Sequence, residues 1–221
     1  MAHDTRGDYL VSEKHRLVYC PIQKAGCSTG YAWFCEIHGQ KYRRGRPRDY
    51  WMRRRPQATW AAILRDYFTF AFVRDPWRRL VSVYLEKHCR PGSALTFRKF
   101  ISTRCKGTPA DFDRHWKPMG WFIGDVTFDA LWPLREMTQR LGEIGARIGI
   151  SPPVRMRNNT PRIGGAWPLV ADWTPEVLLG HDAFPTYAHF YDDALRERVG
   201  EVYAEDVSRF GFEFGDCGVA R

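Results

Sequence analysis

Two short segments of the chain carry side chains suited to binding anions. The first, residues 24–29, supplies an ammonium group from Lys24, a glycine at Gly26 and hydroxyls from the two residues that follow Cys27. In the second, Ser82 follows Arg74 eight positions later. Guanidinium groups bind phosphate in a forked geometry, and ammonium and hydroxyl groups donate further hydrogen bonds to it. The residue types therefore predict two binding segments for phosphate or sulfate groups.

The first segment connects a predicted strand to a predicted helix. Residues 16–22 favour a short buried strand, and the spacing of apolar residues predicts a helix from Cys27 or Ser28 to about Ile37. Backbone amides at a helix start, together with the helix dipole, attract anions, and Gly26 allows a close approach of the backbone. Because Lys24 precedes the glycine, the segment is not a Walker A loop. The alternative is an ordinary turn with a solvated lysine.

The second segment has the same organisation. Residues 67–73 are almost continuously apolar, as in a strand that is buried on both faces. Arg74 and Asp75 then form a turn, and Pro76 suits the first position of a helix. Since open α/β sheets bind ligands at the carboxyl ends of their strands, Arg74 and Ser82 can face one groove. The alternatives are an Arg74–Asp75 ion pair at the helix start and a serine with a structural role.

The remaining elements are predicted from periodicity and turn residues. We expect helices at 96–105, 133–148 and 192–210, a strand at 126–132, and loops at 111–118 and 152–168. Strands that alternate with helices indicate the α/β class. At 221 residues the chain suits a single domain over 1–221, in which residues 152–190 are irregular and face an acceptor.

A basic insert covers residues 41–56. Its basic residues are Lys41, Arg43, Arg44, Arg46, Arg48, Arg53, Arg54 and Arg55, against one acid, Asp49. Aromatic residues are interleaved with them. We expect an exposed, mobile segment, which is either a substrate-binding arm for an anionic glycan or a solvated basic loop.

The composition limits partners and compartment. The chain has 34 Lys and Arg against 25 Asp and Glu, a net charge of +9, which suits an anionic partner such as a nucleotide, a glycan or nucleic acid. No apolar stretch is long enough to span a membrane, no signal peptide is evident, and no zinc-ligand spacing occurs. We therefore expect a cytoplasmic protein without a metal, with its six cysteines as free thiols.

Taken together, the two segments resemble the elements that bind 3′-phosphoadenosine 5′-phosphosulfate (PAPS) in sulfotransferases. Residues 20–28 follow the Cys-Pro-x-x-Lys-x-x-Cys-Ser stretch typical of the carbohydrate sulfotransferases that include chondroitin and dermatan enzymes. His115-Trp116-x-Pro118 and the aromatic end near Phe212 also resemble that family. The likeness spans roughly 17–212. The insert at 41–55 and residues 158–189 depart from the pattern, so the acceptor is the part least defined by it.

The resemblance implies a P-loop-like three-layer sandwich with a central, mainly parallel sheet flanked by helices. It implies in-line transfer of the sulfuryl group of PAPS to a hydroxyl of a carbohydrate or other small hydroxylated acceptor, without a metal. The residues that would bind the donor are Lys24, Ala25, Gly26, Cys27, Ser28 and Thr29 for the phosphosulfate, and Arg74 and Ser82 for the 3′-phosphate. Lys24 would also stabilise the leaving group.

The general base is a separate question. His115 is the first candidate because imidazole titrates near neutral pH and because its context resembles the family motif. The alternative is that His115 only hydrogen-bonds its own loop. His38, Glu36 and Glu86 are further candidates for the base.

Two other functions remain open from the sequence. One is a nucleic-acid-binding protein that uses the basic segment 41–55. The other is a non-sulfuryl P-loop nucleotide-binding enzyme, which the position of Lys24 opposes. The sequence favours the sulfotransferase over both.

Overall fold

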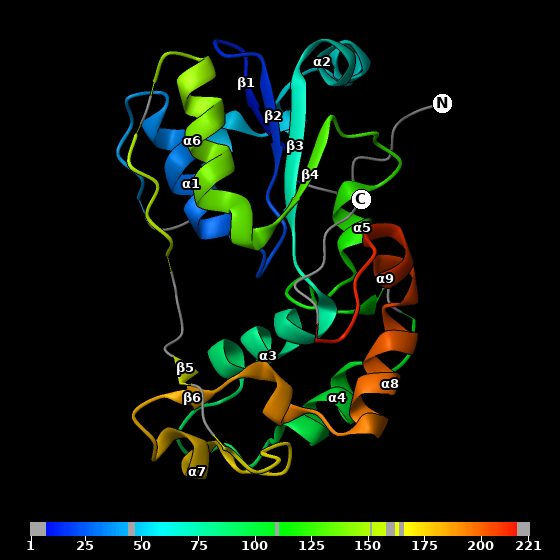
Figure 1. The fold of residues 1–221 in the computed structure, drawn as a ribbon. Coiled ribbons are helices and arrows are strands. Elements are labelled where there is room, and N and C mark those ends of the chain that lie inside the picture. The colour runs from blue at the N-terminus through cyan, green and yellow to red at the C-terminus, as the bar shows by residue number, and fades with distance from the viewer. Residues whose placement is uncertain are drawn as a thin grey trace. The chain divides into compact units, whose positions relative to one another are not determined.

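The computed structural model describes residues 8–43, 47–108, 111–150, 152–157, 162–163 and 166–215 (Figure 1). These residues form two compact units. The first comprises the described residues within 1–73 and 119–158, and the second those within 74–118 and 159–219. The arrangement as a single domain stays a prediction.

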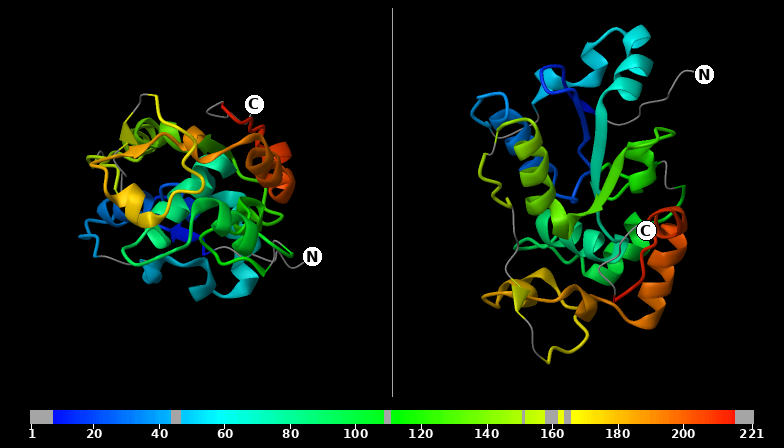
Figure 2. Two further views of the ribbon diagram at one scale, coloured as in Figure 1. Left: turned by 90° about the horizontal axis from the view of Figure 1, so that it is seen from below. Right: turned by 45° about the horizontal axis from the view of Figure 1, so that its top comes forward.

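The first unit is built on a four-stranded sheet. Its strands are β1 (Leu10–Ser12), β2 (Leu17–Cys20), β3 (Phe68–Val73) and β4 (Ala130–Pro133), in the order β1-β2-β3-β4. β1 is antiparallel to β2, whereas β2, β3 and β4 run parallel to their neighbours. Helices α1 (Cys27–Glu36) and α6 (Met137–Arg147) lie on one side of the sheet (Figures 1 and 2). This arrangement confirms the α/β class with a central, mostly parallel sheet flanked by helices.

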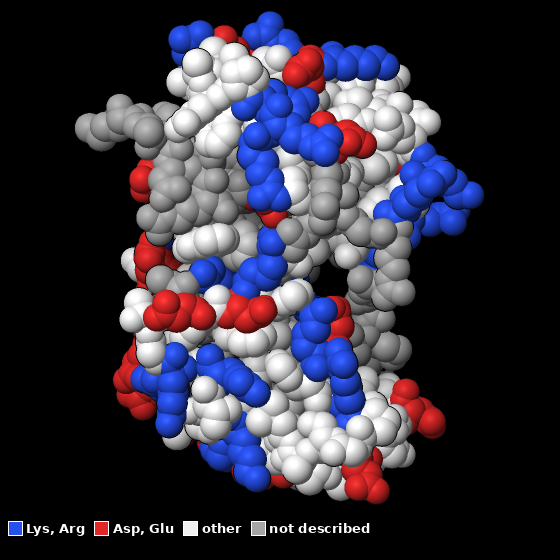
Figure 3. Space-filling view, turned by 180° about the vertical axis from the view of Figure 1, so that it is seen from behind, with Lys and Arg blue, Asp and Glu red and all other residues white. Residues whose placement is uncertain are grey.

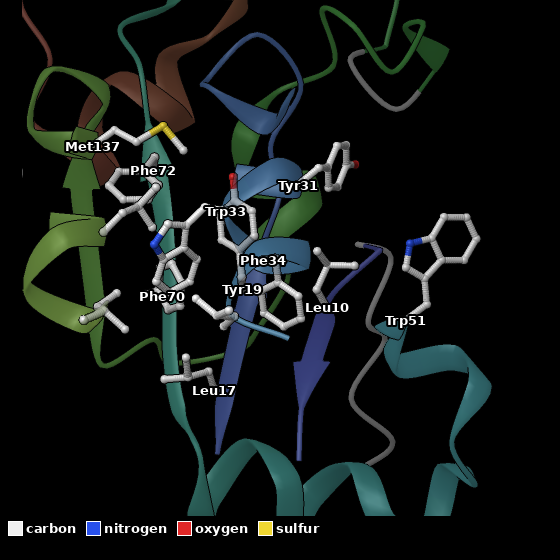
Figure 4. Packing of buried hydrophobic residues seen from close by; sticks show 13 residues of the cluster. Leu10, Leu17, Tyr19, Tyr31, Trp33, Phe34, Trp51, Phe70, Phe72 and Met137 are labelled. Carbon is white, nitrogen blue, oxygen red and sulfur yellow. The ribbon is translucent and has the colours of Figure 1, made fainter. Parts of the chain in front are cut away.

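Successive side chains of each strand point to opposite faces of the sheet, so the two faces pack against different helices. Tyr19, Phe70 and Phe72 point to one face and pack with Trp33 of α1 and Met137 of α6 (Figure 4). The opposite face meets α5 (Met119–Ile123). There the hydroxyl of Tyr9 donates to the carbonyl of Ile123 at 2.5 Å, and Cys20 Sγ lies 3.6 Å from the carbonyl of Phe122. β2 and β3 are thus buried on both faces, and their ends are fixed.

The second unit is mainly helical. It contains α3 (Pro76–Lys87), α4 (Phe97–Arg104), α7 (Pro175–Leu179), α8 (Asp193–Val202) and α9 (Ala204–Phe210), with the short parallel strands β5 (Arg162–Ile163) and β6 (Phe184–Pro185). Its core is aromatic: the ring of Tyr84 packs edge-on against Phe97 at 5.5 Å and lies 6.0 Å from Phe100. These contacts fix α3 against α4.

Several predicted boundaries need correction. The helix predicted at 192–210 is two helices, because the backbone leaves the helical conformation at Tyr203 (φ −111°, ψ 26°), whose buried hydroxyl donates to the carbonyl of Trp116. The strand predicted at 126–132 is confined to β4. The irregular region 152–190 contains α7, β5 and β6, and its residues 158–161 and 164–165 lie outside the described residues.

The prediction that the basic insert is exposed was wrong for Trp51 and Met52 but holds for Arg53 and Arg54, and its mobility stays a prediction. Trp51 is only 4% exposed and Met52 only 1%, and the amide of Met52 donates to the carbonyl of Tyr9 at 2.7 Å. The arginines that follow are paired with acids: Arg53 with Asp8, Arg54 with Asp49 and Arg55 with Glu13. On the face opposite to the view of Figure 1, basic and acidic side chains also lie next to one another (Figure 3). Arg44 and Arg46 lie outside the described residues.

The described residues hold five of the six cysteines, and all five are free; Cys217 lies outside them. Among these residues, no group of three or more His, Cys, Asp or Glu side chains is arranged to hold a metal ion. Within the same residues, no helix has the length and apolar character needed to cross a membrane.

Candidate anion-binding site

The loop between β2 and α1 has an unusual backbone. Lys24 (φ 64°) and Gly26 (φ 82°) both adopt left-handed conformations, which cost a non-glycine residue such as Lys24 about 1–3 kcal/mol. Left-handed residues in a turn direct successive amides toward one side and create a concave site for anions. Because Gly26 is the N-cap of α1, no side chain of the cap competes for the first amides of the helix. The loop therefore has the features of a backbone anion site.

Packing adds a second reason for glycine at position 26. A Cβ there would lie 2.5 Å from Sδ of Met137 and 2.7 Å from Cδ1 of Leu134. The loop thus rests directly on the start of α6. The sequence predicted a close backbone approach at Gly26, but it could not indicate that the approach is to this helix.

The side chains of residues 27–29 differ in what they contact. The thiol of Cys27 lies 3.6 Å from Oε1 of Gln23, and burial raises its pKa although nearby Lys24 acts to lower it. The thiol is therefore protonated at neutral pH. Thr29 is 2% exposed, and its Oγ1 accepts a hydrogen bond from the amide of Arg157 at 2.9 Å. Ser28 is partly exposed.

The start of α3 confirms the predicted strand–turn–helix. Asp75 is the N-cap and accepts a hydrogen bond from the amide of Arg78 at 2.8 Å, and Pro76 is the first helical residue. Burial raises the pKa of Asp75, and the nearby arginines act against that shift. Asp75 lies 3.8 Å from Nε of Arg78, so Arg78 is an ion-pair partner that the sequence hypothesis did not include.

One stripe of α3 stays accessible. Between positions 74 and 85, only Arg74, Arg78 and Ser82 are partly exposed, and every other residue is buried. This spacing of four places them along one side of the helix. The guanidinium of Arg78 also lies 4.4 Å from the centroid of the Tyr187 ring. The sequence already contained Arg78, but only the burial pattern distinguishes it from Arg79, which is 1% exposed and donates to the carbonyl of Lys117.

His115 is part of a carboxylate–imidazole pair. Its Nδ1 lies 2.6 Å from Oδ1 of Asp113, and its amide donates to the same oxygen at 2.8 Å. Although partial burial acts to raise the pKa of Asp113, these hydrogen bonds lower it overall. A carboxylate in this position fixes the orientation of the ring, a feature of many histidine bases. Sequence reasoning had not identified Asp113.

The other candidate bases are in different surroundings. Both ring nitrogens of His38 are engaged, Nε2 with Ser12 Oγ at 3.0 Å and Nδ1 with the carbonyl of Phe34 at 2.7 Å. Glu86 lies 3.4 Å from the ammonium of Lys87. Glu36 lines a cavity beside α1. Lys24 and the loop belong to the first unit, and Arg74, Ser82 and His115 belong to the second.

Comparison with known proteins identifies the family of this chain. The model of the sulfotransferase family matches residues 7–213, which include the β2–α1 loop, the stripe on α3 and His115. Neither the curated proteins nor the solved structures gave a match. Because the match covers nearly the whole chain, this protein belongs to the sulfotransferase family.

Proposed function

We propose that this sulfotransferase uses PAPS as its donor and transfers the sulfuryl group to a hydroxyl of a carbohydrate or other small hydroxylated acceptor. The observation that carries the proposal is the β2–α1 loop. In it, Lys24 and Gly26 both have left-handed conformations, and Gly26 is also the N-cap of α1. Backbone amides and the Lys24 ammonium can there bind one anion together. The proposal includes a single P-loop-like domain formed by both units.

The loop would bind the phosphosulfate. Lys24 stabilises the negative charge that develops on the 5′-phosphate as its bond to sulfur breaks, and this takes the place of a metal ion. The amides of Gly26 and Cys27, with the hydroxyl of Ser28, hold the remaining oxygens, whereas Ala25 closes the turn by donating its amide to the carbonyl of Ile22 at 3.2 Å. Thr29 contributes through its amide, and its hydroxyl, which accepts a hydrogen bond from the amide of Arg157, keeps its own proton to donate.

The stripe on α3 would bind the 3′-phosphate, the group that distinguishes PAPS from ADP. Arg74 offers a forked donor and Ser82 a hydroxyl. Arg78 lies between them on the same side of the helix and adds a second guanidinium. The ring of Tyr187 and the carboxylate of Asp75 support its position.

His115 would act as the base. As the acceptor oxygen forms its bond to sulfur, its proton passes to the imidazole, whose other nitrogen is held by Asp113. The bond between sulfur and the 5′-phosphate oxygen breaks in the same step, so one S–O bond replaces another. Asp113 stabilises the imidazolium that results.

A transfer assay tests this function. The protein is incubated with PAPS labelled in its sulfuryl group and with sugars, oligosaccharides and phenols as acceptors. We expect label to reach at least one hydroxylated acceptor and Lys24→Ala to lose most of that activity. Lys99→Ala, which removes an exposed lysine of α4 outside the proposed binding segments, is the matched control. Transfer by Lys24→Ala at the wild-type rate would contradict the proposed role of the loop.

A further inference from the structure

A groove of about 680 Å³ lies in the second unit, along α8 and α9. These two helices follow one another after the break at Tyr203 (Figure 1). Sites for small molecules usually measure about 300–1,000 Å³, and a cavity of about 150 Å³ in another protein accommodates one benzene ring. The groove therefore has the size of a site for a small molecule with two fused rings.

The floor of the groove is aromatic and fixed in place. The indole of Trp77 lies under Gly200 of α8, where a Cβ would be 3.6 Å from Cζ2 of the ring. Nε1 of Trp77 donates to the carbonyl of Arg196 at 3.0 Å, and the ring of Phe214 packs edge-on against the indole with 5.6 Å between the centroids. Because Gly200 has no side chain, the indole lines the groove at this point. A preformed apolar surface reduces the entropy that is lost when a ligand binds.

One side of the groove is an acidic ridge of α8, formed by Asp193, Glu197 and Glu201. Their spacing of four places the three carboxylates on one side of the helix, where like charges repel one another. Glu201 also lies in the last turn of α8, where the helix dipole disfavours a negative charge. The ridge stands in a chain whose net charge is +9. A bound cation would relieve both unfavourable interactions.

Arginines neutralise only two of the three carboxylates. One guanidinium lies 3.2 Å from Asp193 and another lies 3.4 Å from Glu201. Glu197, between them, has no ion-pair partner among the residues that the structure describes. The guanidinium of Arg196 lies 5.7 Å from the centroid of the Phe214 ring, a distance typical of a cation–π contact. The carboxylate of Glu197 thus faces the groove with its charge uncompensated.

We propose that the groove binds a small organic ammonium ion with an aromatic body. The ammonium group pairs with Glu197, and the rings lie on the floor formed by Trp77, Gly200 and Phe214. Apolar contact supplies affinity, and the acidic ridge supplies the preference for a positive charge. The groove is independent of the proposed function, because its lining includes none of the residues assigned to the donor or to the base.

Titration calorimetry with three matched compounds tests the inference. The compounds are 2-(1-naphthyl)ethylammonium, 2-(1-naphthyl)ethanol and 3-(1-naphthyl)propionate, which carry a positive charge, no charge and a negative charge. We expect the ammonium ion to bind about fivefold more tightly than the alcohol, the effect of one exposed ion pair, and the propionate to bind more weakly than the alcohol. Equal affinities for the ammonium ion and the alcohol would overturn the inference.

Glu197→Gln removes the charge and keeps the shape of the side chain. We expect this variant to lose the preference for the ammonium ion, whereas Glu205→Gln, which changes an exposed glutamate of α9 outside the lining, keeps it. Because Glu197 has like charges on both sides, Glu197→Gln should melt no lower than the wild type. An unchanged preference would contradict the inference, and a lower melting temperature would show that Glu197 serves the fold and not a ligand.

Gly200→Leu tests the place of the rings. A leucine side chain above Trp77 should weaken the binding of both the ammonium ion and the alcohol by about tenfold or more. Gly200→Ala is the matched control, because its Cβ makes only an ordinary contact with the indole and should leave binding almost unchanged. Both substitutions favour the helix over glycine, so we expect both variants to fold. Undiminished binding by Gly200→Leu would exclude the groove as the site.

Two further probes distinguish this groove from other sites. We expect 3′-phosphoadenosine 5′-phosphate (PAP) not to displace the ammonium ion, and Arg74→Ala to bind that ion as the wild type does. Displacement by PAP would place the ion in the donor site and overturn the inference, whereas a failure of PAP to bind would contradict only the donor assignment. A basic amphipathic helical peptide of leucine and lysine represents a protein partner. Binding of this peptide without binding of the ammonium ion would assign the groove to a protein and also overturn the inference.

Discussion

At the residue scale, glycine is required at position 26 for two reasons, its backbone conformation and the lack of space for a Cβ, and their energetic effects can be measured separately. Gly26 has a positive φ of 82°, and a Cβ would approach Met137 to 2.5 Å, whereas Gly39 has a positive φ of 68° with nothing within 4 Å of the corresponding Cβ. We expect Gly26→Ala to reduce the free energy of unfolding by about 1–3 kcal/mol more than Gly39→Ala, the usual cost of overpacking. Urea unfolding of both variants measures this difference, and equal losses would show that the contact with α6 has no energetic effect.

Arg78 provides a second test at the same scale. If it binds the 3′-phosphate with Arg74 and Ser82, Arg78→Ala should weaken the binding of PAP about tenfold, the loss of one charged hydrogen bond. The affinity for ADP, which lacks that phosphate, should not change. Titration calorimetry compares the two nucleotides, with Arg65→Ala as the control for a lost surface charge. Equal losses for PAP and ADP would remove Arg78 from the 3′-phosphate site.

At the element scale, α3 depends on its N-cap. Asp75 is 4% exposed and accepts the hydrogen bond from the amide of Arg78. We expect Asp75→Ala to reduce the free energy of unfolding by about 1 kcal/mol, the typical effect of a lost cap. Asp75→Asn keeps an acceptor oxygen and should lose less. Chemical denaturation distinguishes the two variants, and equal losses would assign the effect to the carboxylate charge.

Elements with strong local signals were predictable from the sequence. The apolar run of β3 indicated a strand buried on both faces, and Pro76 marked the first turn of α3. The structure confirms both, and it confirms the position of α1 after the Lys24 loop. In each case a local preference agrees with the packing around it.

Other elements depend on contacts that are distant in the sequence. The break between α8 and α9 follows from the burial of Tyr203 and its hydrogen bond to Trp116, neither of which affects helical periodicity. Trp51 and Met52 are buried although arginines surround them, because Trp51 pairs with Leu10 in an isolated β-bridge and the amide of Met52 donates to the carbonyl of Tyr9. For the candidate site, residue types predicted Lys24, Arg74 and Ser82, whereas Arg78 and Asp113 required the structure.

At the scale of the whole molecule, two partly buried histidines predict how stability depends on pH. Burial lowers the pKa of His38, next to His15 and Lys14, and burial also lowers that of His88, near Arg104 and Arg90. A histidine whose pKa is lower in the folded than in the unfolded protein binds fewer protons when folded. Stability is therefore complete above the unfolded value of about 6.5 and decreases as the pH falls below it.

Denaturation between pH 8 and pH 5 measures this dependence, a range of about 1.5 units on either side of the histidine pKa. We expect His38→Gln to be less stable at high pH, because it loses contacts with Ser12 and Phe34, but to lose less stability on acidification. A variant with the same pH dependence as the wild type would show that His38 stays neutral in both states or is charged in both.

The donor assignment is the central claim, and a thermal-shift titration with PAP against ADP tests it most directly. At about 100 times its dissociation constant a ligand stabilises a protein by roughly 2.7 kcal/mol. We expect PAP to produce a clear increase in the melting temperature, ADP a smaller one, and Lys24→Ala and Arg74→Ala to diminish the response to PAP. Equal shifts with PAP and ADP in the wild-type protein would contradict the proposed use of PAPS as the donor.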